Sequence, residues 1–86
     1  MKISIVISSF GQAQFLPEAI ESALNQTHID TEIILVDDGS QDGSLEIARS
    51  YEPRIKVIAT TNRGLASARN CGIMNATGEY ILPLDS

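Results

Sequence analysis

The chain has 86 residues, enough for one small domain, and it is 43% hydrophobic and 20% charged. This composition is ordinary for a folded globular protein and excludes a disordered or collagen-like chain. Six Lys and Arg residues against eleven Asp and Glu give a formal net charge of −5, and no basic cluster occurs. We therefore expect no nucleic-acid partner.

The cysteine content and the apolar runs indicate the cellular compartment in which we expect the protein. A single cysteine, Cys71, leaves no partner for an internal disulfide and favours a reducing compartment. The short apolar run at the N-terminus lacks a small-residue cleavage site, so it predicts a strand and not a signal peptide. No run approaches the roughly 18 apolar residues of a membrane span. We expect a cytoplasmic protein, with a full-length parent that can lie peripherally at the inner face of the membrane.

Strand and helix patterns alternate along the chain. Runs rich in β-branched residues mark the strands, and apolar residues three and four apart mark the helices. The expected order is strand 2–8, helix 15–26, strand 32–36, helix 45–51, strand 54–59, helix 65–76 and strand 79–84. This βαβαβαβ order predicts an α/β, Rossmann-like, mostly parallel sheet with right-handed crossovers and helices on both faces.

The fourth strand has two unusual features. Pro83 cannot donate to a sheet ladder, so the strand is expected either to bulge there or to leave that side as a free edge. The sequence stops directly after this apolar run. We therefore expect a half-domain, truncated after its fourth strand.

Polar residues follow every expected strand. In an open parallel sheet, the ligand crevice lies outside the carboxyl ends of the strands, where neighbouring crossovers go to opposite faces. The four groups are 8–10 (Ser-Ser-Phe), 37–38 (Asp-Asp), 60–63 (Thr-Thr-Asn-Arg) and 85–86 (Asp-Ser). We expect these groups to meet in one pocket despite their separation in sequence.

Two phosphate-binding motifs are missing from the sequence. Neither G-x-G-x-x-G after a strand nor G-x-x-x-x-G-K-[ST] occurs, which disfavours a dinucleotide dehydrogenase and a P-loop NTPase. A diphosphate would then need a divalent cation held on carboxylate oxygens, the ligands that hard cations prefer. Asp85 is the candidate carboxylate.

Four blocks in a fixed order contain these polar strand ends: SIVISSF at 4–10, ILVDDGSQDGS at 34–44, NRGLASARN at 62–70 and GEYILPLDS at 78–86. Together they resemble the family 2 glycosyltransferases of the GT-A fold. The resemblance implies an inverting transfer of a sugar from a nucleotide-diphosphate donor, usually a UDP-sugar, to an acceptor hydroxyl, assisted by Mn or Mg. The acceptor is left open among polysaccharide, lipid-linked and protein glycans.

The resemblance also implies roles for residues of the first two blocks. Ser8 and Phe10 match the nucleotide contacts of the first strand, and Phe10 stands where a tyrosine is common and can stack on a base. Asp38 matches the carboxylate that accepts a hydrogen bond from the base, a role that suits the N3–H of uracil. Asp37 is expected to brace the turn.

Residues of the last two blocks complete the expected site. Arg69 matches a helix position facing the nucleotide, and Asp85 opens the Asp-x-Asp motif, whose first member commonly touches the ribose or the metal shell. The second aspartate of that motif and the catalytic base would fall beyond Ser86. We therefore expect residues 1–86 to bind donor nucleotide and to be inactive alone.

Three other interpretations remain open from the sequence. Asp37 and Asp38 can simply shape a turn, with Ser40 or Asp42 capping the next helix. A nonenzymatic module similar to a phosphoacceptor receiver also places aspartates at strand ends, although receivers usually have their acidic pair after the first strand. A truncated sheet also exposes an edge and an apolar face, which favours self-association.

Overall fold

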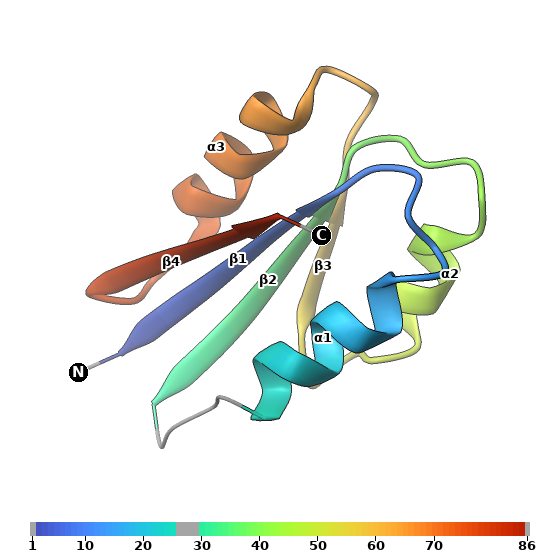
Figure 1. The fold of residues 1–86 in the computed structure, drawn as a ribbon. Helices are drawn as coiled ribbons and strands as arrows, with labels where there is room; N and C mark the ends of the chain where they lie inside the picture. Colours follow the sequence, from blue (N-terminus) through green and yellow to red (C-terminus); the bar gives the residue numbers. More distant parts are fainter. Residues whose placement is uncertain (1, 26–29, 86) are drawn as a thin grey trace.

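A computed structural model describes residues 2–25 and 30–85 as a four-stranded sheet with helices on both faces (Figure 1). The elements are β1 (Ile3–Ser9), α1 (Leu16–Asn25), β2 (Thr31–Asp37), α2 (Ser44–Arg49), β3 (Lys56–Ala59), α3 (Leu65–Asn75) and β4 (Tyr80–Asp85). This confirms the predicted α/β class and the βαβαβαβ order. None of the helices in the described ranges has the length and apolar character needed to span a membrane.

The sheet is entirely parallel and has the strand order β3-β2-β1-β4. The first two crossovers place α1 and α2 on one face, and the third brings α3 back across the other face to β4 (Figure 1). The direction of the crossovers therefore changes between β1 and β4. In open parallel sheets, this switch point is where ligands bind, outside the carboxyl ends of the strands.

Two apolar layers hold the helices on the sheet. Beneath α1 and α2, the layer includes Ile5, Ile7, Leu16, Ile20, Ile33, Leu35 and Ala48. Beneath α3, it comprises Ile34, Val36 and Ala68, with Ile58, Cys71 and Ala76 packed against them. Because successive side chains of a strand point to opposite faces, burial on both faces requires β1 and β2 to be apolar almost throughout.

Helix α3 lies very close to the sheet. A Cβ added at Gly72 would lie 2.3 Å from Cγ1 of Val6 and 3.3 Å from Cγ2 of Val36. Only glycine fits at this contact between helix and sheet. The contact therefore sets the depth at which α3 sits, and with it the position of the residues one turn nearer the helix N-terminus.

Two element boundaries differ from the prediction by two residues, and the other described boundaries differ by at most one. Helix α2 ends at Arg49, not at residue 51, and the chain continues in turns in which Tyr51 N donates to Ala48 O and Arg54 N to Tyr51 O. Strand β3 begins at Lys56, not at residue 54, because its pairing with β2 starts there. Tyr51, the last residue of the predicted helix, packs against the core from the turn that follows α2. The last residue of the predicted first helix, Gln26, lies outside the described residues.

Within the described part of the chain, strand β4 pairs with β1 alone and forms an edge of the sheet. Tyr80 N donates to Lys2 O at 3.2 Å, so alternate residues of β4 turn their N–H groups toward β1. Pro83 is three residues from Tyr80, so its backbone nitrogen faces away from β1. The missing N–H therefore lies on the side of β4 that has no neighbouring strand. Of the two arrangements considered from the sequence, the free edge is the one observed.

A hydrogen-bonded cluster closes the opposite, amino-terminal edge of the sheet. Glu32 Oε2 accepts from Ser4 Oγ at 2.5 Å, from Thr77 N at 2.6 Å and from Thr77 Oγ1 at 3.0 Å. Gly78 N donates to Ser4 Oγ at 2.8 Å, and Lys2 Nζ lies 3.7 Å from Glu32 Oε1. These bonds tie the α3–β4 connection to β1 and β2.

The pKa of Glu32 reflects these bonds. Burial alone would raise the pKa of the Glu32 carboxyl group, but the hydrogen bonds from Ser4 and Thr77, with the charge of Lys2, lower it below its ordinary value of 4.5. The cluster was not anticipated from the sequence, because its members are far apart along the chain and belong to no common motif.

Candidate functional site

The carboxyl ends of the four strands lie side by side along one edge of the sheet. Ser9 pairs with Asp37, and the backbone of Asp85 pairs with Ser8. Thr60 N, just beyond β3, donates to Asp37 O at 2.8 Å. The register therefore brings the polar strand ends together as expected, with Ser86 lying outside the described residues.

Asp38 is buried at this edge, and its carboxylate accepts three hydrogen bonds. Oδ1 accepts from Arg63 N at 2.9 Å and from Thr60 Oγ1 at 3.1 Å, and Oδ2 accepts from Gly64 N at 2.8 Å. The bond from Arg63 N, with those from Gly64 and Thr60, lowers the pKa of Asp38 below its ordinary value of 3.8 despite burial. Asp38 therefore holds the connection that leads into α3, as an ionised group.

The predicted contact between Asp38 and a nucleotide base stays a prediction. An ionised carboxylate has about four acceptor positions, and Oδ2 of Asp38 uses only one of its two in the bonds just described. An N–H of a base could occupy the other. The same carboxylate can thus support the loop and contact a ligand.

Asp37 has a different environment from its neighbour. Its Oδ2 accepts from Ser40 N at 3.0 Å, which confirms the predicted bracing of the turn. Asp37 Oδ1 and Ser9 Oγ are buried and make no hydrogen bond within the described part of the chain. Since these two residues are register partners on β1 and β2, two buried polar atoms without a described partner belong to adjacent strand ends.

Phe10 lies in the connection between β1 and α1, and 44% of its surface is exposed. The loop that follows β2 is bonded to this connection: Gly11 N donates to Ser40 Oγ at 2.7 Å, and Ala13 N donates to Asp42 Oδ2 at 3.1 Å. Sequence reasoning treated Ser40 and Asp42 only as candidate helix caps and missed these contacts. The D-G-S-x-D-G-S spacing signals polar turn residues but does not reveal which distant loop they bind.

Asp42 does contribute at the start of α2. Its Oδ1 accepts from Ser44 N at 3.2 Å and from Ser44 Oγ at 2.5 Å. The Ser44 side chain, followed by the backbone of Ala13, lowers the pKa of Asp42 below 3.8. Ser40, in contrast, bonds to Gly11 and not to the helix.

Ser8 and Arg69 both lie nearer to the carboxyl ends of the strands than the contact between Val6 and Gly72 does. Ser8 is two residues further along β1, a rise of roughly 6–7 Å, and Arg69 is three residues back along α3, a rise of about 4.5 Å. Ser8 is buried and Arg69 is half-buried. The fold thus places both on the α3 side of the candidate site, and their nucleotide contacts stay predictions.

A cleft of about 300 Å³ lies between the end of β3 and α3. Its lining residues are Thr60, Thr61, Arg63, Ser67 and Cys71. Thr60 is also a hydrogen-bond donor to Asp38, so the cleft shares a wall with the buried carboxylate. Hydroxyl groups and one guanidinium give this cleft a surface that can accommodate a polar or anionic ligand.

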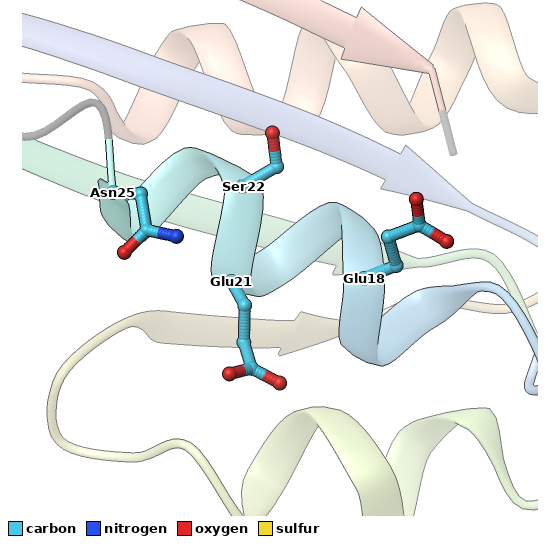
Figure 2. Close-up of a pocket in the computed structure, with 4 residues that line it drawn as sticks. All are labelled: Glu18, Glu21, Ser22 and Asn25. Carbon is cyan, nitrogen blue, oxygen red and sulfur yellow. The ribbon is translucent and has the colours of Figure 1, made fainter.

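A larger and shallower hollow, of about 670 Å³, runs along the outer surface of α1. Figure 2 shows that its four lining side chains, Glu18, Glu21, Ser22 and Asn25, point in different directions from one helix and do not converge. Tyr51 Oη donates to Glu21 Oε2 at 3.2 Å. Two carboxylates would repel a diphosphate, so we do not assign the ligand site here.

The residues described do not form a metal site by themselves. No group of three or more His, Cys, Asp or Glu side chains that could hold a metal ion occurs within residues 2–25 and 30–84. The structure places the backbone of Asp85 beside Ser8, at the switch point between β1 and β4. The predicted role of Asp85 toward a metal or ribose stays a prediction.

Comparison with known proteins gives consistent matches. A protein-family model described as glycosyl transferase family 2 matches residues 4–86. A cholesterol galactosyltransferase of Borreliella burgdorferi is 46% identical over 87 residues, covering 98% of this chain and 24% of the relative. The crystal structure of S. aureus TarS 1–349 in complex with UDP has a TM-score of 0.83 and 25% identity, covering 100% of this chain and 27% of that one.

A further solved structure shares the fold at lower identity. The mannosyltransferase PcManGT from Pyrobaculum calidifontis, in complex with GDP-Man and Mn²⁺, has a TM-score of 0.84 and is 24% identical over 98% of this chain and 27% of that one. The chain thus spans about a quarter of the length of each of these three proteins.

Proposed function

Because this chain belongs to glycosyl transferase family 2, we propose that it binds the nucleotide of a nucleotide-diphosphate sugar, a UDP-sugar, in an enzyme that transfers the sugar to an acceptor hydroxyl with inversion. The observation that carries the proposal is the meeting of the β1, β2 and β4 ends where the crossover direction changes. Phe10 and Asp38 lie just beyond two of these ends. The UDP in the TarS complex supports UDP as the nucleotide.

The chain's residues would bind and orient the donor in distinct ways. The exposed Phe10 ring provides a stacking surface for the base, an interaction worth about 1–3 kcal/mol in nucleic-acid-binding proteins. Asp38 would accept a base N–H on its remaining acceptor position, and Ser8 and Arg69 would approach the nucleotide from the α3 side. An inverting transfer also needs a carboxylate to deprotonate the acceptor, and we assign that role to none of the described residues.

We propose that a divalent cation assists the transfer, but we do not assign a complete set of ligands for it. In such enzymes, Mn²⁺ or Mg²⁺ would stabilise the departing diphosphate. The sequence offers Asp85, whose backbone pairs with Ser8 at the switch point, as its one candidate metal ligand, and a single carboxylate is too few ligands for a complete site. We therefore derive no step through the metal.

Nucleotide binding is best tested at Phe10. In the protein at its full natural length, we expect Phe10→Ala to weaken UDP binding by tenfold or more, about 1.4 kcal/mol, as measured by calorimetry. Phe15→Ala is the matched control, because Phe15 is also exposed, at 57%, at the other end of the same connection. Equal UDP affinity of wild type and Phe10→Ala would contradict the proposal.

Asp38→Ala is a poorer first test of binding. Its carboxylate supports the β3–α3 connection through three bonds, so a loss of UDP affinity in this variant would not separate a ligand contact from a displaced loop. Phe10 makes no comparable contribution to the fold, because much of its side chain is exposed.

The receiver-like alternative is not favoured. Receivers place their acidic pair after the first strand and the phosphate-accepting aspartate after the third. Here the acidic pair follows β2, and β3 is followed by Thr60, Thr61 and Asn62. The family membership agrees with this distinction.

We also propose that residues 1–86 on their own self-associate through β4. Ile3, Tyr80, Ile81 and Leu82 line an almost wholly apolar hollow of about 320 Å³ at this edge. Exposed apolar surface gathered on an edge strand favours association with a second copy.

A further inference from the structure

The loop after β2 is bonded to the connection that bears Phe10. Ser40 Oγ accepts from Gly11 N, and Asp42 Oδ2 accepts from Ala13 N. We call this pair of side chains, Ser40 and Asp42, the loop clasp. Its two acceptors bind alternate N–H groups of a segment that contributes no strand or helix of its own between Ser9 and Leu16.

The loop clasp is itself fixed to the sheet. The backbone of Ser40 donates to Asp37 Oδ2, and the carbonyl of Asp37 accepts from Thr60 N. Asp42 is held through Ser44, whose N–H and hydroxyl both donate to Asp42 Oδ1. A continuous series of hydrogen bonds therefore runs from the ends of β2 and β3 to the β1–α1 connection.

The bond to Gly11 restricts the residue before it. Since the Gly11 nitrogen belongs to the peptide unit that follows Phe10, holding this N–H fixes the orientation of the peptide plane next to the aromatic residue. Gly11 has a φ of 64°, a left-handed conformation that glycine adopts readily and that would otherwise be one of many. Ordering a loop in advance reduces the entropy lost on binding.

Asp42 is suited to this role because it is ionised. The hydroxyl of Ser44 and the N–H of Ala13 lower the pKa of its carboxyl group. Hydrogen bonds to a charged acceptor are stronger than those between neutral groups. The loop clasp thus combines one charged and one neutral acceptor on the same short segment.

We propose that Ser40 and Asp42 are positioning residues that set affinity for the nucleotide base by holding Phe10 in its stacking orientation. The inference rests on the proposed function, in which Phe10 stacks on the base. It assigns to Ser40 and Asp42 a task besides the bonding of Asp42 at the start of α2. They act on the ligand only through Phe10.

The test is a double-mutant cycle in the protein at its full natural length, with UDP affinity measured by calorimetry. Loss of one net hydrogen bond to the β1–α1 connection predicts about two- to tenfold weaker UDP binding in Ser40→Ala and in Asp42→Ala. In the Phe10→Ala background, the same substitutions should produce no further loss, because the ring through which they act is gone. Ser40→Thr, which keeps the hydroxyl, should bind like wild type.

A matched control and a second measurement separate positioning from general loss of structure. Asp30→Ala removes an exposed aspartate at the opposite edge of the sheet and should leave UDP affinity unchanged. Hydrogen exchange of the Gly11 and Ala13 amides should be faster in the loop clasp variants, while exchange of buried β1 amides stays as in wild type. Faster exchange throughout β1 would show unfolding and would overturn the positioning role.

The outcomes distinguish this inference from the proposed function. If Phe10→Ala weakens UDP binding but the loop clasp variants bind like wild type, or lose as much affinity in the Phe10→Ala background as in the wild-type one, the positioning role is wrong and the proposed function stands. If wild type binds no UDP, or Phe10→Ala has no effect, the proposed function is wrong and the positioning role is wrong with it.

Discussion

At the scale of single residues, Asp38 follows the last residue of β2, and its side chain is bonded to the connection that leads into α3. Its carboxylate accepts from Arg63 N and Gly64 N, the last two N–H groups before the helix, and from the Thr60 hydroxyl. A negative charge at a helix N-terminus is favourable because it faces unpaired N–H groups and the positive end of the helix dipole. The same placement keeps the carboxylate ionised.

Asp38→Asn should loosen this connection. The amide retains one acceptor oxygen but presents an NH₂ group to an N–H donor, so at least one of the bonds is lost. We expect hydrogen exchange of the Arg63 and Gly64 amides to become several-fold faster and the melting temperature to fall. Asp37→Ala is the comparison variant, since it removes the acceptor of Ser40 N and should accelerate exchange at Ser40 instead. Unchanged protection at Gly64 would show that the bonds to Asp38 do not hold the connection.

At the scale of elements, the position of α3 depends on a contact that has no room for a side chain. A methyl group at Gly72 would be 2.3 Å from a methyl of Val6, well inside the separation of carbon atoms in contact. The helix would have to move away from β1. The residues of α3 that lie beside the candidate site would move with it.

Gly72→Ala should therefore destabilise the fold by about 1–3 kcal/mol, the usual cost of overpacking, as measured by urea unfolding. Val6→Ala removes the opposing methyl groups and, by itself, should be destabilising because it leaves a void. The double variant should then be less destabilised than the sum of the two single variants, because the new methyl occupies the space that Val6 gave up. Simple additivity would mean that the two positions do not share this contact.

The α3–β4 connection depends on the Glu32 cluster at the other edge of the sheet. Three donors from Ser4 and Thr77 converge on one carboxylate oxygen and lower the pKa of Glu32 in the folded state. A group whose folded pKa lies below its unfolded pKa stabilises the fold above the unfolded pKa. That contribution is lost as the pH falls through the folded pKa.

Glu32→Gln should cost about 1 kcal/mol at pH 7, a modest value for charged hydrogen bonds that are partly open to water. The difference in unfolding free energy between wild type and variant should persist at pH 6 and shrink as the pH falls through 4.5, the ordinary pKa of the group, at which half of the unfolded carboxyl groups are protonated. Denaturant titrations across this pH range measure it. Glu79→Gln, at an exposed position nearby, should show little effect, and a difference independent of pH would contradict the charged role of Glu32.

At the scale of the whole molecule, the sequence predicted the layers better than the contacts between loops. Periodicity predicts strands and helices because it reflects burial on one or two faces, and βαβ order then determines a parallel sheet with aligned strand ends. Hydrogen bonds such as Ser40 to Gly11 or Thr77 to Glu32 join segments 29 and 45 residues apart. Their partners depend on loop conformation, which no period in the sequence records.

Asp38 illustrates the same limit within the predicted site. Its location at a strand end followed from the apolar run before it, but its burial and its three bonds depend on where the β3–α3 connection turns. The shortened α2 and β3 have a similar origin, because the turns between residues 50 and 55 take up residues whose composition suits either element.

The free edge at β4 is the other whole-molecule feature that composition did not determine. Pro83 leaves a gap in the donors on its outer side, which disfavours pairing with a further strand. The apolar side chains of Tyr80, Ile81 and Leu82 remain exposed beside it. Association between copies of residues 1–86 should therefore occur through side-chain packing and not through extension of the sheet.

Leu82→Lys tests this expectation on residues 1–86 by themselves. A lysine can keep its aliphatic stem against Ile3 while its charged end reaches water, so the fold should tolerate the change and association should not. In sedimentation experiments, the average molecular mass of wild type should rise with protein concentration. The average mass of Leu82→Lys should stay at the value of the monomer. Met74→Lys, on the outer surface of α3, where the methionine is 85% exposed, should behave like wild type. A wild-type chain that stays monomeric at the highest concentration, or a Met74→Lys variant that abolishes association equally, would show that β4 is not the contact surface.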